Sequence, residues 1–230
     1  MVQDNLTIAP LTRGDIHDVV AIEGMSFPSR WQPGAYENEL MNPKSFYCVA
    51  LQSSQVVGFT GMWTSHDEAH ITTLAVHPDF RRRGIGQRLL RALLCKSAGL
   101  EVERVTLEVR AGNQAAIALY QKHGFVQIAY LPRYYSDTGE DGVIMWLKPV
   151  ALPDVSRRPR VVVLKSVHET MLAESLLKSA GVEHRMIPKP VSIGTDCGMA
   201  ITFEMRNEVL VMGVLRAHGL EASIVVASEL

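Results

Sequence analysis

Three stretches rich in apolar residues follow one another at short intervals in the first third of the chain. Short apolar runs bounded by turn signals are typical of strands. Short polar segments separate the stretches, as the turns of an antiparallel meander would. We therefore expect three consecutive strands of one sheet, at Phe46–Leu51, Val56–Thr64 and Ala69–Val76, joined by turns at Gln52–Gln55 and His66-Asp67.

The period changes to that of a helix directly after the third strand. From Gly84, one face carries Ile85, Leu89, Leu90, Leu93 and Leu94, whereas the opposite face carries Arg88, Arg91 and Lys96. Apolar residues spaced by three and four predict an amphipathic helix that packs on the sheet and ends near Gly99.

The same signals place the remaining elements of the first 149 residues. Thr12 and Asp15 resemble a capping box before a helix that carries Ile16, Val19, Val20 and Met25, and Asn113 caps a helix that ends before Gly124. Further elements are a short helix at Pro33–Met41 and strands at Val105–Arg110, Phe125–Tyr130 and Val143–Lys148. Together they predict an α/β (α+β) fold in which helices flank a mixed sheet.

A stretch with two prolines, three arginines and no apolar periodicity lies at Val150–Arg160. Such a composition is typical of a linker. We expect a first domain at 1–149, a linker at 150–159 and a second domain at 160–230. The second domain has the element order βαββαβ of a ferredoxin-like fold, with strands at Val161–Lys165, Glu183–Ile187, Met199–Glu204 and Leu220–Ala227 and helices at His168–Ala180 and Arg206–His218.

Composition excludes several classes of protein. The chain of 230 residues is 47% hydrophobic and 20% charged with a net charge of -1, so we expect a globular protein that binds neither nucleic acid nor membrane. The start of the chain lacks the basic flank and apolar run of a secretory signal, and we expect a cytoplasmic location. Three widely spaced cysteines, Cys48, Cys95 and Cys197, predict neither a disulfide framework nor a metal site.

A turn rich in arginine and glycine joins the third strand to the long helix. Arg81-Arg82-Arg83-Gly84-Ile85-Gly86 leaves bare backbone N–H groups at the first turn of a helix, where the helix dipole favours negative charge. Glycines let the backbone approach phosphate oxygens closely, and arginines add charge-assisted hydrogen bonds. A pyrophosphate would fit this turn. The alternative is a glycine-containing turn beside a solvated basic face.

Five stretches of residues 1–149 together resemble the GCN5-related N-acetyltransferase (GNAT) superfamily. Within it, they are similar to the bacterial ribosomal-protein alanine N-acetyltransferases. The stretches are SFPSRW (Ser26–Trp31), LAVHPDFRRRGIG (Leu74–Gly86), LEVRAGNQAAIALYQKHGF (Leu107–Phe125), PRYYSDTGEDG (Pro132–Gly142) and VIMWLK (Val143–Lys148). In the first stretch the tryptophan lies one residue further from the Phe-Pro pair than is common in the family.

The resemblance implies acetyl-CoA as cosubstrate and no metal. The backbone N–H groups of Arg82, Arg83, Gly84, Ile85 and Gly86 would bind the pyrophosphate, with Arg81 at the leading position of the motif. The backbone of Leu74 and Val76 would pair with the pantetheine arm like an added strand. Asn113 would contact the cofactor near the second helix.

Two residues are expected to carry the acid and base chemistry. Glu108 alternates with apolar neighbours, so it projects to the face opposite the core, and the resemblance implies that it is the general base. Tyr120 lies two helical turns past Asn113, and the resemblance implies that it protonates the departing thiolate. The sequence alone leaves open that Glu108 pairs with Arg110 or Arg82, and that Tyr120 is a core aromatic residue.

The expected substrate is an extended N-terminal peptide, and the resemblance implies that of a ribosomal protein. Trp31, Tyr134 and Tyr135 would form an aromatic slot for it, although loop packing is the alternative role for all three. An α-amino group has a pKa near 8 against about 10.4 for lysine, so one carboxylate suffices to deprotonate it. The leading expectation is therefore a protein Nα-acetyltransferase. The alternatives are an enzyme that acetylates a small amine or a lysine, and a non-catalytic coenzyme A sensor.

Residues 160–230 lie outside the acetyltransferase resemblance. They resemble a small bacterial domain described as a selenium or sulfur carrier-like module, marked by Cys197-Gly198 in a polar loop. An exposed loop cysteine would be a reactive carrier thiol, and an inert small residue at a turn is the alternative. Cys48 and Cys95 fall in strand and helix patterns, and we expect both to be buried.

Overall fold

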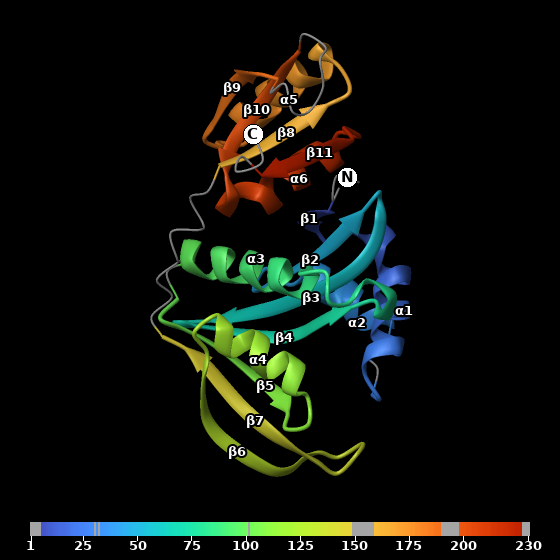
Figure 1. The fold of residues 1–230 in the computed structure, drawn as a ribbon, viewed down its shortest axis with the longest axis vertical. Coiled ribbons are helices and arrows are strands. Elements are labelled where there is room, and N and C mark those ends of the chain that lie inside the picture. The colour runs from blue at the N-terminus through green and yellow to red at the C-terminus, as the bar shows by residue number, and fades with distance from the viewer. Residues whose placement is uncertain are drawn as a thin grey trace. The chain divides into compact units, whose positions relative to one another are not determined.

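The computed structural model of the chain describes residues 6–29, 31, 33–100, 102–148, 159–189 and 198–226. These residues form two compact units, which are considered separately (Figure 1). The described strands build two sheets, a mixed sheet of seven strands and a sheet of four. The boundary expected at 150–159 stays a prediction, because residues 149–158 lie outside the described part of the chain.

The first 148 residues contain seven strands and four α-helices among those described. The strands are β1 (Leu6–Pro10), β2 (Ser45–Gln52), β3 (Gln55–Ser65), β4 (Glu68–Val76), β5 (Arg104–Arg110), β6 (Val126–Tyr135) and β7 (Glu140–Leu147). The α-helices are α1 (Ile16–Ser26), α2 (Pro33–Met41), α3 (Ile85–Gly99) and α4 (Gln114–Lys122). Every strand and helix expected here is present, and β1 is an additional strand that the sequence analysis missed.

The large sheet has the strand order β1-β2-β3-β4-β5-β7-β6. The β3·β4, β5·β7 and β6·β7 pairs are antiparallel, whereas β4 and β5 run parallel. A parallel pair needs a crossover connection, and α3 provides it. The predicted mixed sheet with flanking helices is confirmed.

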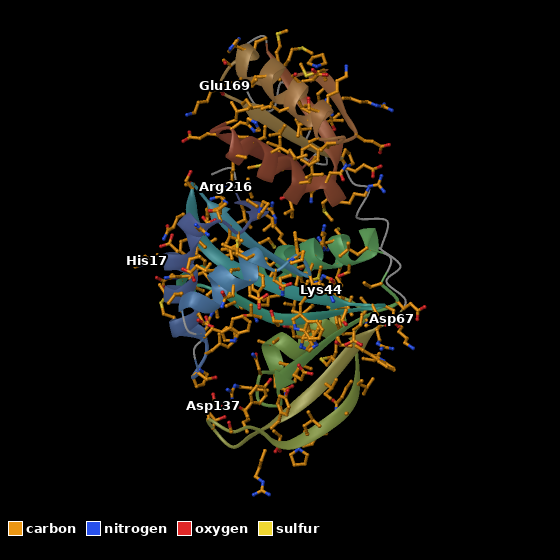
Figure 2. The ribbon with its side chains drawn as sticks, turned by 180° about the vertical axis from the view of Figure 1, so that it is seen from behind. His17, Lys44, Asp67, Asp137, Glu169 and Arg216 are labelled. Atoms are coloured by element: carbon orange, nitrogen blue, oxygen red, sulfur yellow. The ribbon has the colours of Figure 1, made fainter. Side chains whose placement is uncertain are left out.

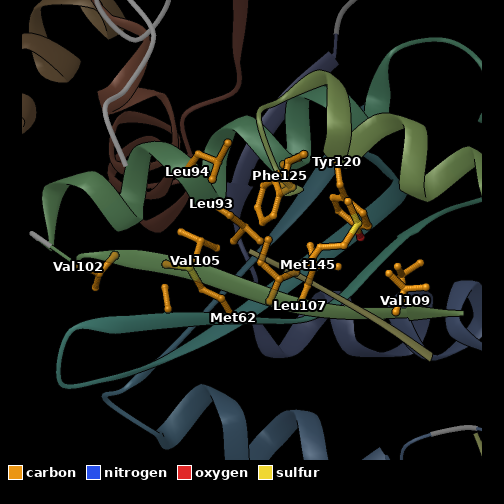
Figure 3. Close-up of a cluster of buried hydrophobic side chains, with 14 residues drawn as sticks. Met62, Leu93, Leu94, Val102, Val105, Leu107, Val109, Tyr120, Phe125 and Met145 are labelled. Atoms are coloured by element: carbon orange, nitrogen blue, oxygen red, sulfur yellow. The ribbon is translucent and has the colours of Figure 1, made fainter. Parts of the chain in front are cut away.

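A cluster of buried hydrophobic residues lies between the large sheet and the helices α3 and α4 (Figure 3). Leu90 and Leu93 of α3 are fully buried, and they pack with Val105 and Leu107 of β5 and Met145 of β7. The apolar face predicted from Gly84 onwards is therefore the buried face of α3. It fixes the start of α3 beside the ends of the central strands.

The elements after the expected linker are β8 (Pro159–Leu164), α5 (Val167–Ser179), β9 (His184–Pro188), β10 (Met199–Glu204), α6 (Glu208–Ala217) and β11 (Ala222–Val226). Its sheet has the order β11-β8-β10-β9, and every pair is antiparallel. In chain order this reads fourth, first, third, second, as the predicted βαββαβ arrangement requires. Arg160 and Glu208 form an ion pair inside it, with side chains only 9% and 8% exposed.

The cysteine predictions are only partly correct. Cys48 in β2 is buried as expected, but Cys95 in α3 is half-buried, because it lies at the edge of the apolar face rather than in its middle. Cys197 lies outside the described residues, so its expected role as a carrier thiol stays a prediction.

Candidate active site

The central strands β4 and β5 part in the middle of the sheet. Their parallel pairing covers Glu68–Ile71 against Arg104–Leu107 and ends there, although β4 continues to Val76 and β5 to Arg110 (Figure 1). A register shift accompanies the end of pairing: Met62 of β3 faces Ile71, but Gly61 faces Thr73, so Thr72 is an extra residue. A bulge of this kind bends a strand. It leaves the last residues of β4 without a strand partner on the β5 side.

The expected cofactor residues Leu74 and Val76 lie on this unpaired part of β4. An open strand edge offers backbone groups to an extended ligand. The carbonyl oxygen of Val76 already accepts a hydrogen bond from Arg81 Nε at 3.0 Å, which holds the following turn against the strand.

The arginine-rich turn is braced by its own side chains. Arg81 also donates to Ser26 Oγ at 3.2 Å, and Arg83 donates to the carbonyl oxygen of Asp79 at 3.0 Å and lies over the Phe80 ring. Two of the three arginines therefore fix the shape of the turn. The anion-binding groups of this turn are its backbone N–H groups, as at any helix start.

Gly84 is the residue directly before α3, and its backbone is left-handed, with φ +79°. Residues with a Cβ adopt this conformation only at a cost, so the turn requires glycine here. A Cβ added at Gly84 would meet no atom within 4 Å, whereas one at Gly86 would contact Leu119, Leu74 and Val76. The first turn of α3 is thus packed against the end of β4 and presents an open backbone at Gly84.

Asn113 caps α4 as predicted: its Oδ1 accepts the backbone N–H of Ala116 at 3.1 Å. The side chain is thereby oriented at the N-terminus of α4. Its expected contact with the cofactor stays a prediction.

Glu108 is the first residue of β5 beyond the parallel pairing, opposite Ile144 of β7. Its side chain is 26% exposed, and its Oε2 lies 3.1 Å from His70 Nε2 on β4. The alternative in which Glu108 pairs with Arg110 is wrong, because Arg110 is engaged elsewhere. The carboxylate therefore stands at the fork between the strands, with a histidine as its partner.

Arg110 holds the β6–β7 hairpin through several contacts. It donates two hydrogen bonds to Asp137, at 3.0 and 2.7 Å, contacts Glu140 at 3.4 Å, and lies 4.0 Å from the centre of the Tyr135 ring. Asp137 lies at the tip of this hairpin (Figure 2). A bidentate and stacked arginine fixes both position and orientation. Tyr135 is therefore held next to β5.

The expected substrate residues Tyr134 and Tyr135 lie near Glu108. Their rings are 5.1 Å apart and perpendicular, and Tyr134 is 48% exposed. Burial raises the pKa of Tyr135 to about 12, a shift that Arg110 opposes and the Glu108 charge supports. Burial and the Glu108 charge also raise the pKa of Tyr134. The two tyrosines and Glu108 thus share one electrostatic environment.

Tyr120 of α4 is buried, at 7% exposure, among the core residues, with its ring 5.6 Å from that of Phe125 (Figure 3). Burial, followed by the nearby Tyr135 hydroxyl, raises the pKa of Tyr120, so its phenol stays protonated. Tyr120 therefore packs as a core aromatic residue. Its pKa is also raised by Tyr135, whose own pKa is raised by the Glu108 charge, so Tyr120, Tyr135 and Glu108 lie near one another.

Trp31 lies in the loop between α1 and α2 and is 37% exposed. Its backbone N–H donates to Glu23 Oε1 at 3.1 Å, and its ring packs against Tyr36 at 5.6 Å. This loop reaches the hairpin, because Ser29 adds a hydrogen bond to Asp137 beside those from Arg110 and helps to lower the pKa of that carboxyl. The loop that carries Trp31 and the β6–β7 hairpin that carries the two tyrosines therefore meet.

The sequence analysis missed several residues of this site. His70 could have been found, because it follows the buried Ala69 on a strand that is parallel to the one carrying Glu108, so both project to the same face. Glu23 falls on the apolar face of α1, where a carboxylate is unusual. The ion pair of Arg110 with Asp137 joins positions 27 residues apart, and no local pattern signals it.

Among the described residues, no cluster of three or more histidine, cysteine, aspartate or glutamate side chains could hold a metal ion. No helix in the described part of the chain has the length and apolar character needed to cross a membrane.

Comparison with known proteins identifies both parts of the chain. Residues 16–125 match the family model described as "Acetyltransferase (GNAT) family", and residues 160–226 match one described as "Putative Se/S carrier protein-like". An N-alpha-acetyltransferase RimI from Mycobacterium tuberculosis is 37% identical over 146 residues, which cover 61% of this chain and 90% of that protein. The [ribosomal protein bS18]-alanine N-acetyltransferase of Escherichia coli is 31% identical over 148 residues, 64% of this chain and 99% of that protein.

Solved structures show the same similarity for the first part of the chain. The crystal structure of the ribosomal-protein-S18-alanine N-acetyltransferase from Escherichia coli is 31% identical, with a TM-score of 0.59 over 64% of this chain and 96% of that one. The relatives are matched over nearly their whole length. The chain is an acyltransferase that belongs to the GNAT family of N-acetyltransferases.

Proposed function

We propose that this protein transfers the acetyl group of acetyl-CoA to the α-amino group of a protein N-terminus, with ribosomal protein bS18 as the first candidate substrate. The observation that carries the proposal is the place of Glu108. It stands where β4 and β5 part, close enough to Tyr134 and Tyr135 at the end of β6 for its charge to raise the pKa of both. The names of relatives matched over nearly their full length support the same reaction and substrate.

The residues around the arginine-rich turn fit coenzyme A. Gly84 leaves open the space that any side chain would fill, and the start of α3 is fixed beside the open edge of β4. The backbone N–H groups from Arg82 to Gly86 would hold the pyrophosphate. The backbone of Leu74 and Val76 would hold the pantetheine arm, and Asn113 would lie near the cofactor. Acetyl-CoA supplies a thioester-activated acetyl group.

Glu108 is the general base in this proposal. The amine must lose a proton as it forms the new bond to the acetyl carbon, and a carboxylate within reach of that nitrogen accepts it, directly or through one water. An α-amino group with a pKa near 8 is neutral in a useful fraction of molecules at physiological pH, whereas a lysine with a pKa of about 10.4 is not. One carboxylate at the fork is enough for an N-terminal amine.

Tyr120 is the general acid in this proposal. Its raised pKa keeps the phenol protonated at every physiological pH. A protonated phenol donates to the sulfur as the bond to the acetyl carbon breaks, and water returns the proton afterwards. Its burial in the core fixes the ring, so the proton is delivered from one position.

Trp31, Tyr134 and Tyr135 would bind the first residues of the substrate. Two of them are partly exposed aromatic rings, and Tyr135 is fixed by Arg110. Aromatic side chains supply a large contact area at low entropic cost. A protein N-terminus is extended and flexible, so a slot between two loops suits it better than a closed pocket would.

The test is a competition between amines. Purified protein is incubated with acetyl-CoA and a mixture of three acceptors: a peptide that begins with the bS18 N-terminus, the same peptide with a blocked N-terminus and an internal lysine, and a small polyamine. Mass spectrometry then locates the acetyl group. We expect acetylation of the free α-amine, with little on the other two acceptors. Preferential acetylation of lysine or polyamine would refute the assignment of the substrate.

A further inference from the structure

A continuous series of close polar contacts leads from Glu108 away from the fork. His70 Nε2 lies 3.1 Å from Glu108 Oε2, and His70 Nδ1 lies 2.9 Å from Thr106 Oγ1. Thr106 Oγ1 in turn lies 2.7 Å from Glu68 Oε1, and Arg104 Nε lies 2.7 Å from Glu68 Oε2. These groups alternate between β4 and β5 along the paired part of the two strands, with Glu108 directly after it. The proposed mechanism uses Glu108 and gives no role to the other four residues of the series.

Glu68, the carboxylate at the other end of this series from Glu108, is ionised. Burial alone would raise the pKa of Glu68, but hydrogen bonds from Thr106 and Arg104 outweigh it and hold that pKa below its usual value. An ionised carboxylate can only accept hydrogen bonds, and a threonine hydroxyl has a single proton to donate. The Thr106 proton therefore points to Glu68. The hydroxyl oxygen can then only accept from His70, so His70 carries a proton on Nδ1.

A neutral histidine has a proton on one ring nitrogen only. With Nδ1 protonated, Nε2 presents a lone pair to the Glu108 carboxylate, and two acceptors face each other at 3.1 Å. One additional proton between Nε2 and Oε2 converts this contact into a hydrogen bond. Such a proton would also remove the repulsion between the two facing acceptors.

We propose that Thr106, Glu68 and Arg104 lock the tautomer of His70 so that Glu108 and His70 act as a one-proton pair that receives the proton of the substrate amine. This inference deepens the proposed function and rests on Glu108 as the base. The amine nitrogen loses its proton to Glu108 Oε2 while it bonds to the acetyl carbon. The new O–H donates to Nε2 of His70, and the pair releases the proton to water after the product leaves. His70 is thus a positioning residue, and Thr106 acts through it.

Other groups that face the pair do not supply this lock. Tyr134 and Tyr135 of β6 lie close enough for the Glu108 charge to raise the pKa of both, but their phenols stay protonated. Arg110 of β5 is paired with Asp137 and Glu140. On the β3 side, Trp63 packs on the His70 ring at 5.1 Å and carries no charge. Among the described residues around the ring, Thr106 is the hydrogen-bond partner of Nδ1.

Thr106→Val tests the lock, because valine has the same shape and lacks the hydroxyl. Thr106→Ser is the matched control, since it keeps the hydroxyl. In the first experiment, the full chain is labelled with ¹⁵N-histidine, and the His70 signals are assigned with His70→Gln. At alkaline pH we expect Nδ1–H in the wild type and in Thr106→Ser, and a change to Nε2–H in Thr106→Val. An Nε2–H tautomer in the wild type would overturn the proposal.

The second experiment measures kcat/KM against pH for the same proteins. Once Nε2–H is allowed, neutral His70 can donate to Glu108 without an additional proton. The acidic limb of the kcat/KM profile of Thr106→Val should therefore move to lower pH, whereas Thr106→Ser should keep the wild-type limb. If the acidic limb of a folded Thr106→Val stays at the wild-type pH, the proposed locking of the His70 tautomer is wrong.

Glu108→Gln separates this failure from failure of the proposed function. If Glu108→Gln turns over like the wild type, Glu108 is not the base, and both proposals fall. If Glu108→Gln is inactive and Thr106→Val keeps both the wild-type limb and the wild-type tautomer, only the lock falls.

Discussion

Replacing Gly84 tests the phosphate-binding turn. Gly84 has φ +79°, and a Cβ there would meet no atom within 4 Å. Any other residue therefore pays backbone strain of about 1–2 kcal/mol but no steric clash. Gly84→Gln and Gly84→Glu share this strain and have nearly the same size. They differ in one negative charge at the open backbone of the helix start.

The magnitude of the charge effect follows from Coulomb's law. Two unit charges about 5 Å apart interact by about 3 kcal/mol at an effective dielectric constant of about 20, and by less when water screens them. Since about 1.4 kcal/mol corresponds to a factor of ten, Gly84→Glu should bind coenzyme A roughly 10-fold to 200-fold more weakly than Gly84→Gln.

Isothermal titration calorimetry with coenzyme A measures the two dissociation constants, and thermal unfolding checks that both variants are equally folded. The ratio should shrink as salt is added, because salt screens exposed charges. Equal affinities of Gly84→Glu and Gly84→Gln, in equally stable proteins, would refute the assignment of the pyrophosphate to this turn.

Three further predictions concern stability. Asn113→Ala removes the cap of α4 and should lower the free energy of unfolding by about 1 kcal/mol; Ser166→Ala, which removes a cap of equal length at α5, is the matched control, and denaturant unfolding measures both. Arg110 lowers the pKa of Asp137, so the stabilisation by this carboxylate is present at neutral pH and is lost as the pH falls below about 4; the difference in Tm between the wild type and Asp137→Asn should shrink over that range, and a constant difference would contradict it. Glu208→Leu leaves the buried charge of Arg160 without its carboxylate and should lower the free energy of unfolding by about 3–5 kcal/mol, whereas adding Arg160→Met to Glu208→Leu should restore most of it. A double variant as unstable as Glu208→Leu alone would contradict this prediction.

The sequence predicts the elements of this protein well because their signals are local. The three-stranded meander, the apolar face of α3 and the cap at Asn113 each depend on residues within a few positions of one another, and each is observed. β1 was missed because Leu6–Pro10 follows a polar start and is too short to show a clear alternation.

The arrangement of the site could be predicted only in part. Glycine before a helix and a glutamate among apolar strand residues are local signals: Gly84 directly precedes α3, and Glu108 directly follows the paired part of β5. The extra residue at Thr72, the pairing of Glu108 with His70 and the anchoring of Tyr135 by Arg110 depend on contacts between different strands. Such contacts follow from strand register, which no local pattern of this chain fixes.

The most direct test of the whole account is the turnover of Glu108→Gln on a peptide with a free N-terminal amine. The amide keeps the size of the carboxylate but cannot accept the amine proton. We predict that kcat falls by roughly 10²- to 10⁴-fold, the usual contribution of a general base, while the affinity for coenzyme A changes little. Wild-type turnover in a folded Glu108→Gln would contradict the account, because the residue at the fork of β4 and β5 would then have no part in the chemistry.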